Sequence, residues 1–422
     1  MNKESTEQTA QLKYDTSEVK NQSMLIEYNQ KKKVCLLSTF APQKCGIAVF
    51  TKDLVDNLDL SGELAPAKVI AVTRKSDIDY YGKEVVWQIR KNEEEDYVQA
   101  ATRINSSNFD LVNIQHEFGI FGGEFGSYIL SFLAEIKKPV VTSLHTVQPD
   151  FDPKALSVLK EIISLSEAVV VTGHTAACIL KGYGVPTEKI KVIQHGCPDV
   201  PFTSSSLFKP SLNLAGRNVL CTFGLLSRGK GIEYVIQTLP SIIAEHPEVL
   251  YLVIGQTHPE VRISDDENYR RYLMQLVEEL ELQNHVKFHN RFLPRQELIW
   301  YLQATDIYIT PYLGKNQISS GTLIYALGTG RAVVSTPYLH AQEVLADGRG
   351  LLCEFRNPTS IANAVNRLLD DNCLKLEIEK KAYEYSRSFT WSEVAKKYAK
   401  LFKQITTDEE EVTPIEIPAH NA

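Results

Sequence analysis

Residues 219–231 read VLCTFGLLSRGKG, an apolar run of strand length followed by a glycine-rich turn. Ile232 and Val235 continue at helical spacing, so the segment predicts a strand, a turn and a helix N-terminus. Such a turn exposes backbone N–H groups at the positive end of the helix dipole, and Arg228 and Lys230 add full positive charges. The segment therefore predicts a βα unit of a parallel sheet with an anion, such as a phosphate, at the turn.

The same residues leave two other interpretations open. An ordinary βα turn with solvated basic side chains needs no ligand. The spacing also nearly matches the phosphate-binding loop GxxxxGK followed by Ser or Thr, whose hydroxyl ligates magnesium. Gly231 occupies that last position, and the loop lies far beyond the first strand of the chain, which disfavours an ATPase or GTPase.

Apolar runs of strand length recur in two series, and each run is followed by a helical pattern. Their continuous hydrophobicity is typical of parallel strands covered on both faces by helices. The fold class is therefore α/β, with two Rossmann-like, doubly wound domains. The expected strands are 34–37, 69–72, 111–114, 140–143, 168–171 and 190–193 in the first half, and 219–223, 249–254, 286–288, 306–309, 332–335 and 350–353 in the second.

Composition along the chain predicts the domain boundaries. Residues 1–32 are polar, lack an apolar segment of signal-peptide length and are interpreted as the disordered leader of a cytoplasmic protein. We expect a first domain over 33–205 and a second over 206–387, with a Pro- and Ser-rich linker between their sheets. A helix expected over about 388–406 has a wide apolar face and is assigned to the first domain, and 407–422 is an acidic tail.

The composition excludes several classes of protein. The 422 residues carry 45 Lys and Arg against 52 Asp and Glu, a net charge of −7, whereas a nucleic-acid binder needs positive charge for phosphate contacts. No apolar run approaches the roughly 18 residues of a membrane span, which leaves at most a peripheral contact with the inner face of a membrane. The seven cysteines form no CxxC pair and are interpreted as reduced packing residues.

A second anion site is expected in the middle of the second domain. Residues 311–322 read PYLGKNQISSGT and lead into an apolar helix. Ser319 or Ser320 can cap that helix, Gly321 lets a ligand approach the backbone, and Thr322 follows in the first turn. Simple capping without a ligand is the alternative interpretation.

In the first half, Gly46 follows the first strand and permits close backbone approach, but no GxGxxG is present, so a nicotinamide cofactor is not supported. His116 and Glu117 end one predicted strand, and His145 ends the next. Strand-end histidines can donate to sugar hydroxyls or phosphates, whereas a histidine satisfied by backbone groups is the alternative. Two open sheets joined by one linker bring their strand ends to a shared crevice, so we expect these groups between the domains.

These motifs, in this order, resemble the family 4 glycosyltransferases of GT-B fold, from about residue 33 to residue 405. The more specific parts are FGLLSRGKGIEYVIQTLP, DIYITPYLGKNQISSGTLIYALGTGRAVVST and EVLADGRGLL. The resemblance implies two Rossmann-like domains facing a central cleft, with a nucleotide-sugar donor held mainly by the second and an acceptor mainly by the first. It assigns the active-site histidine to His145, the diphosphate-binding lysine to Lys230 and the first-domain glycine loop to Gly46.

Two positions depart from the pattern of that family. Leu225 stands where the family has an arginine, so Arg228 would supply the charge from the next turn. The family's two glutamates, separated by seven residues, are also replaced. Tyr325 takes the second place, which commonly contacts the nucleotide ribose, and Gln317, or Asn316 by an alternative count, takes the first, which contacts the donor hexose. Gln and Asn can still bond to sugar hydroxyls, whereas Tyr cannot accept bidentately.

The resemblance implies a retaining glycosyltransferase that moves a hexose, mannose or glucose, from a nucleoside diphosphate sugar to a saccharide or glycoconjugate acceptor, as in polysaccharide biosynthesis. Basic side chains would stand in for a metal ion, so no cofactor is expected beyond the nucleotide-sugar co-substrate. A catalytically silent nucleotide- or sugar-binding homologue and a P-loop-like phosphohydrolase are the alternatives. The assigned residues are His145, Lys230 and Arg228 as catalytic; Gly46, Gly224, Gln317, Ser319, Ser320, Gly321, Thr322 and Tyr325 as donor-binding; and His116 and Glu117 as acceptor- or sugar-binding.

Overall fold

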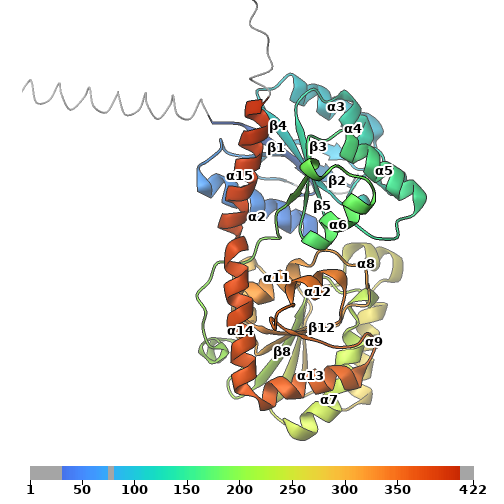
Figure 1. The fold of residues 1–422 in the computed structure, drawn as a ribbon. Helices are drawn as coiled ribbons and strands as arrows, with labels where there is room; N and C mark the ends of the chain where they lie inside the picture. The colour runs from blue at the N-terminus through green and yellow to red at the C-terminus, as the bar shows by residue number, and fades with distance from the viewer. Residues whose placement is uncertain (1–30, 75–79, 409–422) are drawn as a thin grey trace, which may run out of the picture.

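The computed structural model describes residues 31–74 and 80–408, so nearly all of the predicted leader and acidic tail lie outside the described residues. Within them the chain forms two α/β domains, one above the other, with two helices running along one side of both (Figure 1). None of the described helices combines the length and the apolar character that crossing a membrane requires.

The first domain contains one parallel sheet with the strand order β3-β2-β1-β4-β5-β6-β7. The order reverses beside β1, which pairs with β2 on one side and β4 on the other. Ligands bind to such sheets outside the carboxyl ends of the strands at this switch point. The strands are β1 (Val34–Ser38), β2 (Lys68–Thr73), β3 (Val85–Arg90), β4 (Leu111–His116), β5 (Val140–Leu144), β6 (Ala168–Val171) and β7 (Ile190–Val192).

The second domain repeats this plan with the strand order β10-β9-β8-β11-β12-β13, again parallel throughout. Its switch point lies beside β8, the strand that enters the glycine-rich turn. The strands are β8 (Asn218–Phe223), β9 (Val249–Ile254), β10 (Val286–His289), β11 (Ile307–Thr310), β12 (Ala332–Ser335) and β13 (Leu351–Leu352).

Helices flank both sheets. Those of the first domain are α2 (Gly46–Ser61), α3 (Glu94–Asn105), α4 (Ile129–Glu135), α5 (Pro153–Ser164) and α6 (His174–Gly182). The second domain has α7 (Ile232–Glu245), α8 (Pro259–Asp265), α9 (Asn268–Glu279), α10 (Arg295–Gln303), α11 (Gly321–Gly328), α12 (Leu339–Val344), α13 (Pro358–Asp370) and α14 (Asn372–Ser386), and the last helix is α15 (Trp391–Asp408).

The burial of the strands explains their sequences. All five residues of β1 and all six of β9 are buried, which matches the uninterrupted apolar runs that predict them. The edge strand β3 instead reads VVWQIR and is mostly half-buried or exposed, so no apolar run predicts it. Continuous hydrophobicity therefore finds the buried strands of this fold and misses an edge strand.

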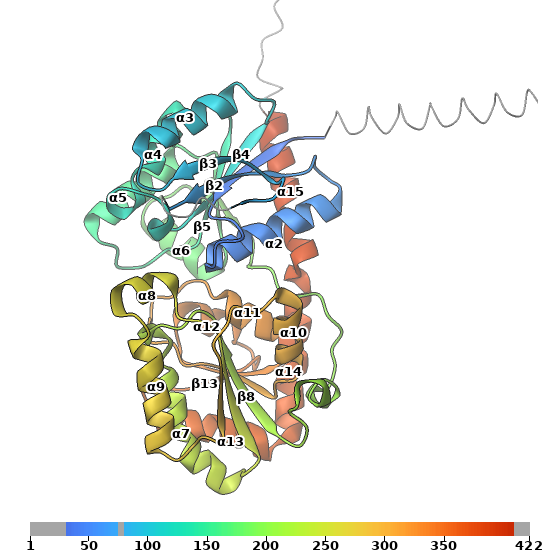
Figure 2. The ribbon, with the colours of Figure 1, turned by 180° about the vertical axis from the view of Figure 1, so that it is seen from behind.

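The last helix of the chain returns to the first domain. α14 and α15 run along one side of the molecule, and α15 packs against α2 (Figures 1 and 2). The Trp391 side chain is 2% exposed, and a Cβ on Gly196 would clash with its indole ring. Further along α15, the Tyr398 hydroxyl lies 3.0 Å from the Ser143 hydroxyl of β5. The helices α14 and α15 therefore pack against the second and the first domain respectively.

All seven cysteines are free, and four of them are buried packing residues: Cys35, Cys197, Cys221 and Cys353. Cys45 has a different role, because its Sγ accepts a hydrogen bond from the Ala48 N–H and caps α2. Cys178 and Cys373 are exposed, so the prediction that the cysteines are packing residues is wrong for these two.

A buried ion pair holds the linker on the second domain. Lys209 Nζ lies 2.6 Å from Asp306 Oδ2, and the two side chains are 12% and 5% exposed. Asp306 also accepts hydrogen bonds from the Ser205 hydroxyl at 2.6 Å and from the Val219 N–H at 2.7 Å. Three donors from the linker and β8 therefore converge on one carboxylate.

Truncation of Asp306 is expected to destabilise the protein strongly. Removing one partner of a buried ion pair leaves the other charge uncompensated and typically costs about 3–5 kcal/mol. We expect Asp306→Ala to lower the free energy of unfolding by that amount in urea titrations. Glu377→Ala is the control, because Glu377 pairs with Lys381 at the surface of α14, where ion pairs contribute about 0–1 kcal/mol. Equal losses in both variants would contradict the anchoring role of Asp306.

Candidate functional site

The turn after β8 and the N-terminus of α11 lie against each other. A Cβ on Gly224 would lie 3.4 Å from Thr322 Cγ2 and 4.0 Å from Lys230 Nζ. Lys230 Nζ also lies 3.8 Å from the centroid of the Tyr312 ring, and the Tyr312 hydroxyl is 2.7 Å from Thr322 Oγ1. The two anion sites that the sequence predicts separately are therefore neighbouring parts of one surface.

Backbone packing fixes this turn. Gly231 has φ +62°, and a Cβ there would clash with the carbonyl oxygen of Pro311. The carbonyl of Gly229 accepts a hydrogen bond from the Leu313 N–H at 2.9 Å. A serine or threonine at position 231 would not fit this conformation, so the magnesium-ligating hydroxyl of a P-loop has no place here.

The start of α11 is organised by two side chains. Ser320 is the N-cap, and its Oγ accepts from the Leu323 N–H. The N–H of Ser320 donates to Nδ1 of the buried His340 on α12 at 3.0 Å. The first N–H groups of a helix have no intrahelical acceptor, so those of Gly321 and Thr322 are available to a ligand. The predicted donor site thus has both a lysine ammonium and helix N–H groups.

Gln317 and Ser319, which were predicted to bind the donor, and Arg228, which was predicted to be catalytic, all have partners within the protein. The Gln317 amide donates to the carbonyl of Ser319 at 3.0 Å, so both residues take part in a local bond before α11. Arg228 Nε lies 3.5 Å from Asp265 Oδ2 of α8, and the guanidinium lies over the Tyr269 ring. In this conformation the largely exposed Arg228 side chain contacts α8 and α9, and its catalytic role stays a prediction.

In the first domain, Gly46 lies at the start of α2. A Cβ on Gly46 would have no atom within 4 Å, so packing does not require glycine and the space beside the helix start is open. Phe50, one turn further along α2, packs against His145 with ring centroids 4.7 Å apart. The glycine loop and the strand-end histidine are therefore close neighbours.

A buried polar network holds His145 at the end of β5. Its Nε2 donates to Gln115 Oε1 at 2.8 Å, and the Gln115 amide lies 3.3 Å from the Ser143 hydroxyl. Burial, together with nearby His195 and His116, lowers the pKa of His145 to about 3. The ring is therefore neutral at pH 7, with Nδ1 as its remaining acceptor.

The two residues predicted to bind an acceptor, His116 and Glu117, have different surroundings in the structure. His116 is completely buried between Phe118 and Phe121, neither ring nitrogen has a hydrogen-bond partner, and burial lowers its pKa to about 4. Aromatic side chains cover His116 in this structure, which disfavours a contact with a sugar, and that contact stays a prediction. Glu117 is half-buried, and its Oε2 accepts from the Thr146 hydroxyl at 2.6 Å. Burial raises the pKa of Glu117 despite this hydrogen bond.

The ring of His195, which lies just before the linker, packs against the N-terminus of α11. Its Nδ1 donates to the Gly196 carbonyl at 2.8 Å, and a Cβ on Gly321 would lie 2.6 Å from its Nε2. The ring makes edge-to-face contacts with Phe50 and Trp391, at centroid distances of 5.0 and 5.4 Å. Burial lowers the pKa of His195 to about 4, so it is a neutral contact between the two domains.

Tyr325 makes a contact between the domains. Its hydroxyl donates to Asp53 Oδ2 of α2 at 2.5 Å and accepts from Trp391 Nε1 at 3.3 Å. Arg295 Nη1 of α10 lies 2.8 Å from Asp53 Oδ1. Burial raises the pKa of Asp53, although Arg295 and Tyr325 act against that shift. The Tyr325 hydroxyl therefore bonds to a residue of the first domain, and its contact with a donor stays a prediction.

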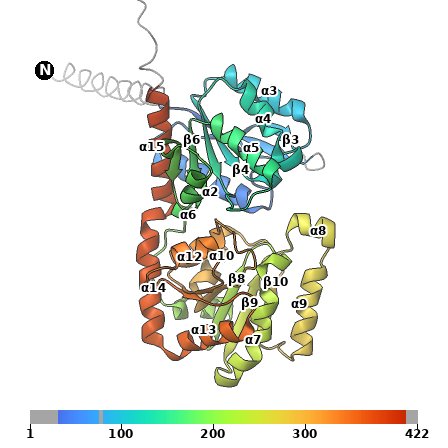
Figure 3. The ribbon, with the colours of Figure 1, turned by 45° about the vertical axis from the view of Figure 1, so that its right-hand side comes forward.

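Two more contacts cross between the domains. Glu343 of α12 accepts from the N–H groups of His174 and Thr175 at 2.7 and 2.9 Å, so it caps α6, which lies above α12 in Figure 3. Burial alone would raise the pKa of Glu343, but these hydrogen bonds outweigh it and lower the pKa. Arg74, after β2, forms an ion pair with Glu260 of α8. The two domains are therefore in direct polar contact around the site.

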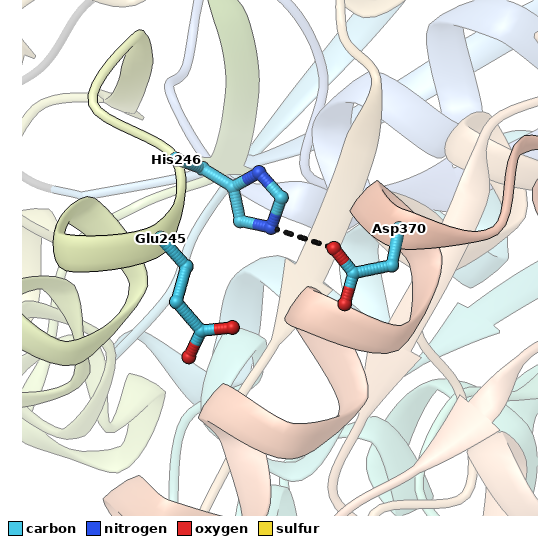
Figure 4. A group of neighbouring side chains, drawn as sticks. All are labelled: Glu245, His246 and Asp370. Carbon is cyan, nitrogen blue, oxygen red and sulfur yellow. Dashed lines mark ion pairs between the residues drawn. The ribbon is translucent and has the colours of Figure 1, made fainter.

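A separate polar group lies at the other end of the second domain. Glu245, His246 and Asp370 have ligand atoms within 4.8 Å of one another, and His246 Nε2 lies 3.2 Å from Asp370 Oδ1 (Figure 4). Glu245 ends α7, and the 14 residues of this helix place the group about 20 Å from the glycine-rich turn. We therefore assign it no part in the candidate site, and the expectation that the site needs no metal stays a prediction.

Comparison with known proteins gives this site a family context. Residues 205–388 match the model of glycosyl transferases group 1. The D-inositol 3-phosphate glycosyltransferase of Corynebacterium urealyticum is 25% identical over 271 residues, which are 62% of each chain. An uncharacterized glycosyltransferase of Methanocaldococcus jannaschii is 28% identical over 193 residues, or 44% of this chain and 45% of that protein. The second domain of the chain is therefore similar to the group 1 glycosyl transferases. The chain spans less than two thirds of the length of these two curated relatives.

Solved structures show the same fold. HepE of Anabaena, in complex with UDP and glucose, superimposes with a TM-score of 0.70 at 17% identity, over 88% of this chain and 100% of that chain. Sucrose-phosphate synthase of Thermosynechococcus elongatus gives a TM-score of 0.72 at 18% identity, over 90% of this chain and 100% of that chain. The fold is therefore GT-B, as the sequence resemblance implied.

Several residues around the site were not predicted, among them His340, Glu343 and Asp53. His340 and Glu343 lie three residues apart and therefore share one face of α12, and Glu343 begins the EVLADGRGLL segment. Asp53 is a charged residue on the apolar face of α2, three residues after Phe50. A buried charge within an apolar helix face is the signal that could have identified Asp53.

Buried histidines are expected to make the fold sensitive to mild acid. The folded-state pKa values are about 4, 3, 4 and 4 for His116, His145, His195 and His340, below the ordinary 6.5. Between pH 6.5 and about 4 the unfolded chain therefore binds more protons than the folded chain. Stability is full above that window and is lost as the pH falls, by up to about 1.4 kcal/mol per pH unit for each histidine. Urea unfolding at pH 7.5, 6.5 and 5.5 measures this loss.

Single variants identify the source of that loss. Replacing His340 by glutamine is expected to reduce the slope of stability against pH, whereas replacing the exposed His174 leaves it unchanged. Burial raises the folded-state pKa values of Asp53 and Glu117, so as the pH falls the folded chain takes up their protons before the unfolded chain does. These two carboxyl groups therefore add stability as the pH falls, which is opposite to the effect of the histidines. A slope that is identical in the wild type and the His340 variant would show that this histidine does not contribute.

Proposed function

We propose that the chain is a retaining glycosyltransferase that moves a hexose, mannose or glucose, from a nucleoside diphosphate sugar to a saccharide or glycoconjugate acceptor. The observation that carries this proposal is the contact of Lys230, Gly224 and Thr322 at the N-terminus of α11. A diphosphate is stabilised both by an ammonium group and by the free N–H groups of a helix start. The match of residues 205–388 to group 1 glycosyl transferases supports the same ligand class.

The proposed mechanism is mainly electrostatic. As the bond between the anomeric carbon and the leaving phosphate breaks, negative charge builds on the phosphate oxygens. Lys230 and the N–H groups of Gly321 and Thr322 stabilise that charge. The leaving phosphate accepts the proton of the acceptor hydroxyl that attacks on the same face, so the anomeric configuration is retained. His145, neutral at pH 7, orients the sugar or acceptor by a hydrogen bond.

A catalytically silent homologue is the second candidate. The replacement of both family glutamates favours it, and so does the Tyr325 hydroxyl, which bonds to Asp53. Such a protein would bind a nucleotide sugar without turnover. The third interpretation, a P-loop-like phosphohydrolase, is disfavoured by Gly231, where the Pro311 carbonyl excludes a hydroxyl-bearing side chain.

Removal of the Lys230 charge is expected to lower turnover at least ten-fold. The contact between ammonium and leaving phosphate strengthens in the transition state, and its loss costs at least about 1.4 kcal/mol. We expect Lys230→Met, which keeps the aliphatic stem, to show this loss in kcat with a nucleotide-sugar donor. Lys287→Met, at an exposed position of β10, is the matched control. Unchanged turnover in a folded Lys230→Met protein would remove Lys230 from the site.

A thermal-shift screen tests the proposed function before any acceptor is known. A ligand at about 100 times its Kd stabilises the folded state by about 2.7 kcal/mol. We expect one of GDP, UDP and ADP, with its sugar conjugates, to raise the melting temperature, and Lys230→Met to abolish the effect. Stabilisation without turnover of any donor would favour the silent homologue. Magnesium-dependent phosphate release without an acceptor would favour the phosphohydrolase, whereas a glycosyltransferase that needs no metal keeps its turnover in EDTA.

A further inference from the structure

A cluster of three potential metal ligands lies at the end of the second domain away from the glycine-rich turn. Glu245 is the last residue of α7, His246 is its C-cap, and Asp370 is the last residue of α13. The three side chains extend from the two helix ends toward a common point, and their ligand atoms lie within 4.8 Å of one another (Figure 4). We call these residues the helix-end cluster. The proposed function uses none of them.

The helices that carry the cluster run side by side in the same direction. The Thr238 hydroxyl, in the middle of α7, donates to the carbonyl of Pro358, the first residue of α13, at 3.0 Å. Both helices then end at the cluster. A helix C-terminus carries the equivalent of about half a negative charge. The carboxylates of Glu245 and Asp370 therefore add two full negative charges where two helix dipoles are already negative.

No basic side chain balances this charge in the described part of the chain. Within residues 31–74 and 80–408, neither Glu245 nor Asp370 forms an ion pair with a lysine or an arginine. Asn366, one turn before Asp370 on the same face of α13, donates through Nδ2 to Glu245 Oε1 at 2.9 Å. This hydrogen bond orients the carboxylate without adding a positive charge. The cluster is therefore a negatively charged site that a cation would stabilise.

The His246 ring supplies a nitrogen that no other described group uses. The side chain is 14% exposed, and its Nε2 is shielded from solvent and makes no hydrogen bond with any described residue. Asp370 Oδ1 lies 3.2 Å from this Nε2, but the two atoms are not aligned for a hydrogen bond. Two ligands bound at about 2.0–2.1 Å to a tetrahedral zinc ion are about 3.3 Å apart. The observed separation therefore matches that of two ligands sharing one ion.

We propose that the helix-end cluster binds a divalent transition-metal ion, preferentially Zn²⁺, through His246 Nε2 and the carboxylates of Glu245 and Asp370. An imidazole nitrogen beside carboxylates suits zinc, whereas magnesium and calcium prefer oxygen ligands alone. Asn366 is a positioning residue, because it holds a carboxylate that binds the ion. The bound ion joins the C-termini of α7 and α13 and stabilises the second domain. This inference does not depend on the proposed function.

Zinc binding by the full-length protein tests the proposal directly. The protein is freed of metal with EDTA, dialysed and titrated with zinc chloride in a calorimeter. We expect one zinc ion to bind per chain at the cluster, and His246→Gln and Glu245→Gln each to weaken this binding at least ten-fold. His174→Gln and Glu384→Gln are the matched controls, because both side chains are exposed and lie outside the cluster.

Exposed thiols are the competing zinc ligands of this chain. Cys178 and Cys373 are exposed, so the titration is repeated on a protein in which both are replaced by serine, and we expect zinc binding to be retained. The proposal is overturned if zinc binding is lost with the cysteines or is unchanged in His246→Gln. Binding of calcium or magnesium as tightly as zinc would also overturn it, because the imidazole would then have no role.

The charge argument predicts that Glu245→Gln changes stability in opposite directions without and with zinc. In EDTA the variant is expected to melt at a higher temperature than the wild type, because it removes a negative charge from a helix C-terminus. In zinc the wild type is expected to melt at the higher temperature, because a bound ion stabilises the folded state. Gln keeps an oxygen that accepts from Asn366. A difference in melting temperature that is the same in both solutions would show that zinc does not bind through Glu245.

The nucleotide thermal shift separates this proposal from the proposed function. The length of α7 places the cluster about 20 Å from the glycine-rich turn, so the two ligands are expected to act independently. Lys230→Met is expected to keep the zinc shift and lose the nucleotide shift, and Glu245→Gln the reverse. If zinc does not stabilise the wild type, the helix-end cluster is overturned as a metal site, and the proposed function stands on the nucleotide result.

Discussion

The candidate site depends on the close packing of Gly231 against the carbonyl of Pro311. Only a residue without a Cβ, at positive φ, fits between the glycine-rich turn and the end of β11. This packing holds Lys230 over the ring of Tyr312, whose hydroxyl bonds to Thr322. Two loops that are distant in the sequence are thereby joined into one surface by backbone packing and by these side-chain contacts, and the charge of Lys230 is held close to the N–H groups of α11.

The placement of the domains depends on carboxylates that find their donors in the opposite domain. Asp53 of the first domain is held by Tyr325 and Arg295 of the second, and Glu343 of the second caps α6 of the first. Buried ion pairs contribute little net stability, because desolvation offsets much of their attraction, but unpaired buried charges are costly. These contacts therefore specify the relative orientation of the domains more than they raise the total stability.

Much of the fold follows from one-dimensional patterns. Parallel strands that are covered on both faces need continuous apolar sequences, and the strands inside both sheets were all predicted, as were the edge strands β7, β10 and β13. The strand β3 was not predicted, because its exposed edge position tolerates the polar residues Gln88 and Arg90. The GT-B fold itself came from the resemblance, since periodicity alone gives two α/β domains and not their pairing.

The side-chain geometry of the site was much less predictable. His116 and His145 both end adjacent strands, yet one is enclosed by phenylalanines and the other bonds to Gln115. His340 bonds to the backbone N–H of Ser320, and no pattern of side chains in the sequence records such a contact. Glycine turns were predictable because backbone conformation requires them, whereas the partners of buried polar groups depend on the three-dimensional packing.

Tyr325 shows how a change in the donor site is linked to the contact between the domains. A glutamate at this position, as in the resembling family, would place a second carboxylate beside Asp53, and two like charges at hydrogen-bond distance oppose each other strongly. A neutral hydroxyl instead donates to Asp53, and Arg295 balances the remaining charge. A glutamate at position 325 would therefore conflict with Asp53, whereas the hydroxyl of Tyr325 fits beside it. As a consequence α11 has two roles, with its N-terminus facing the proposed diphosphate and its Tyr325 side docking on α2.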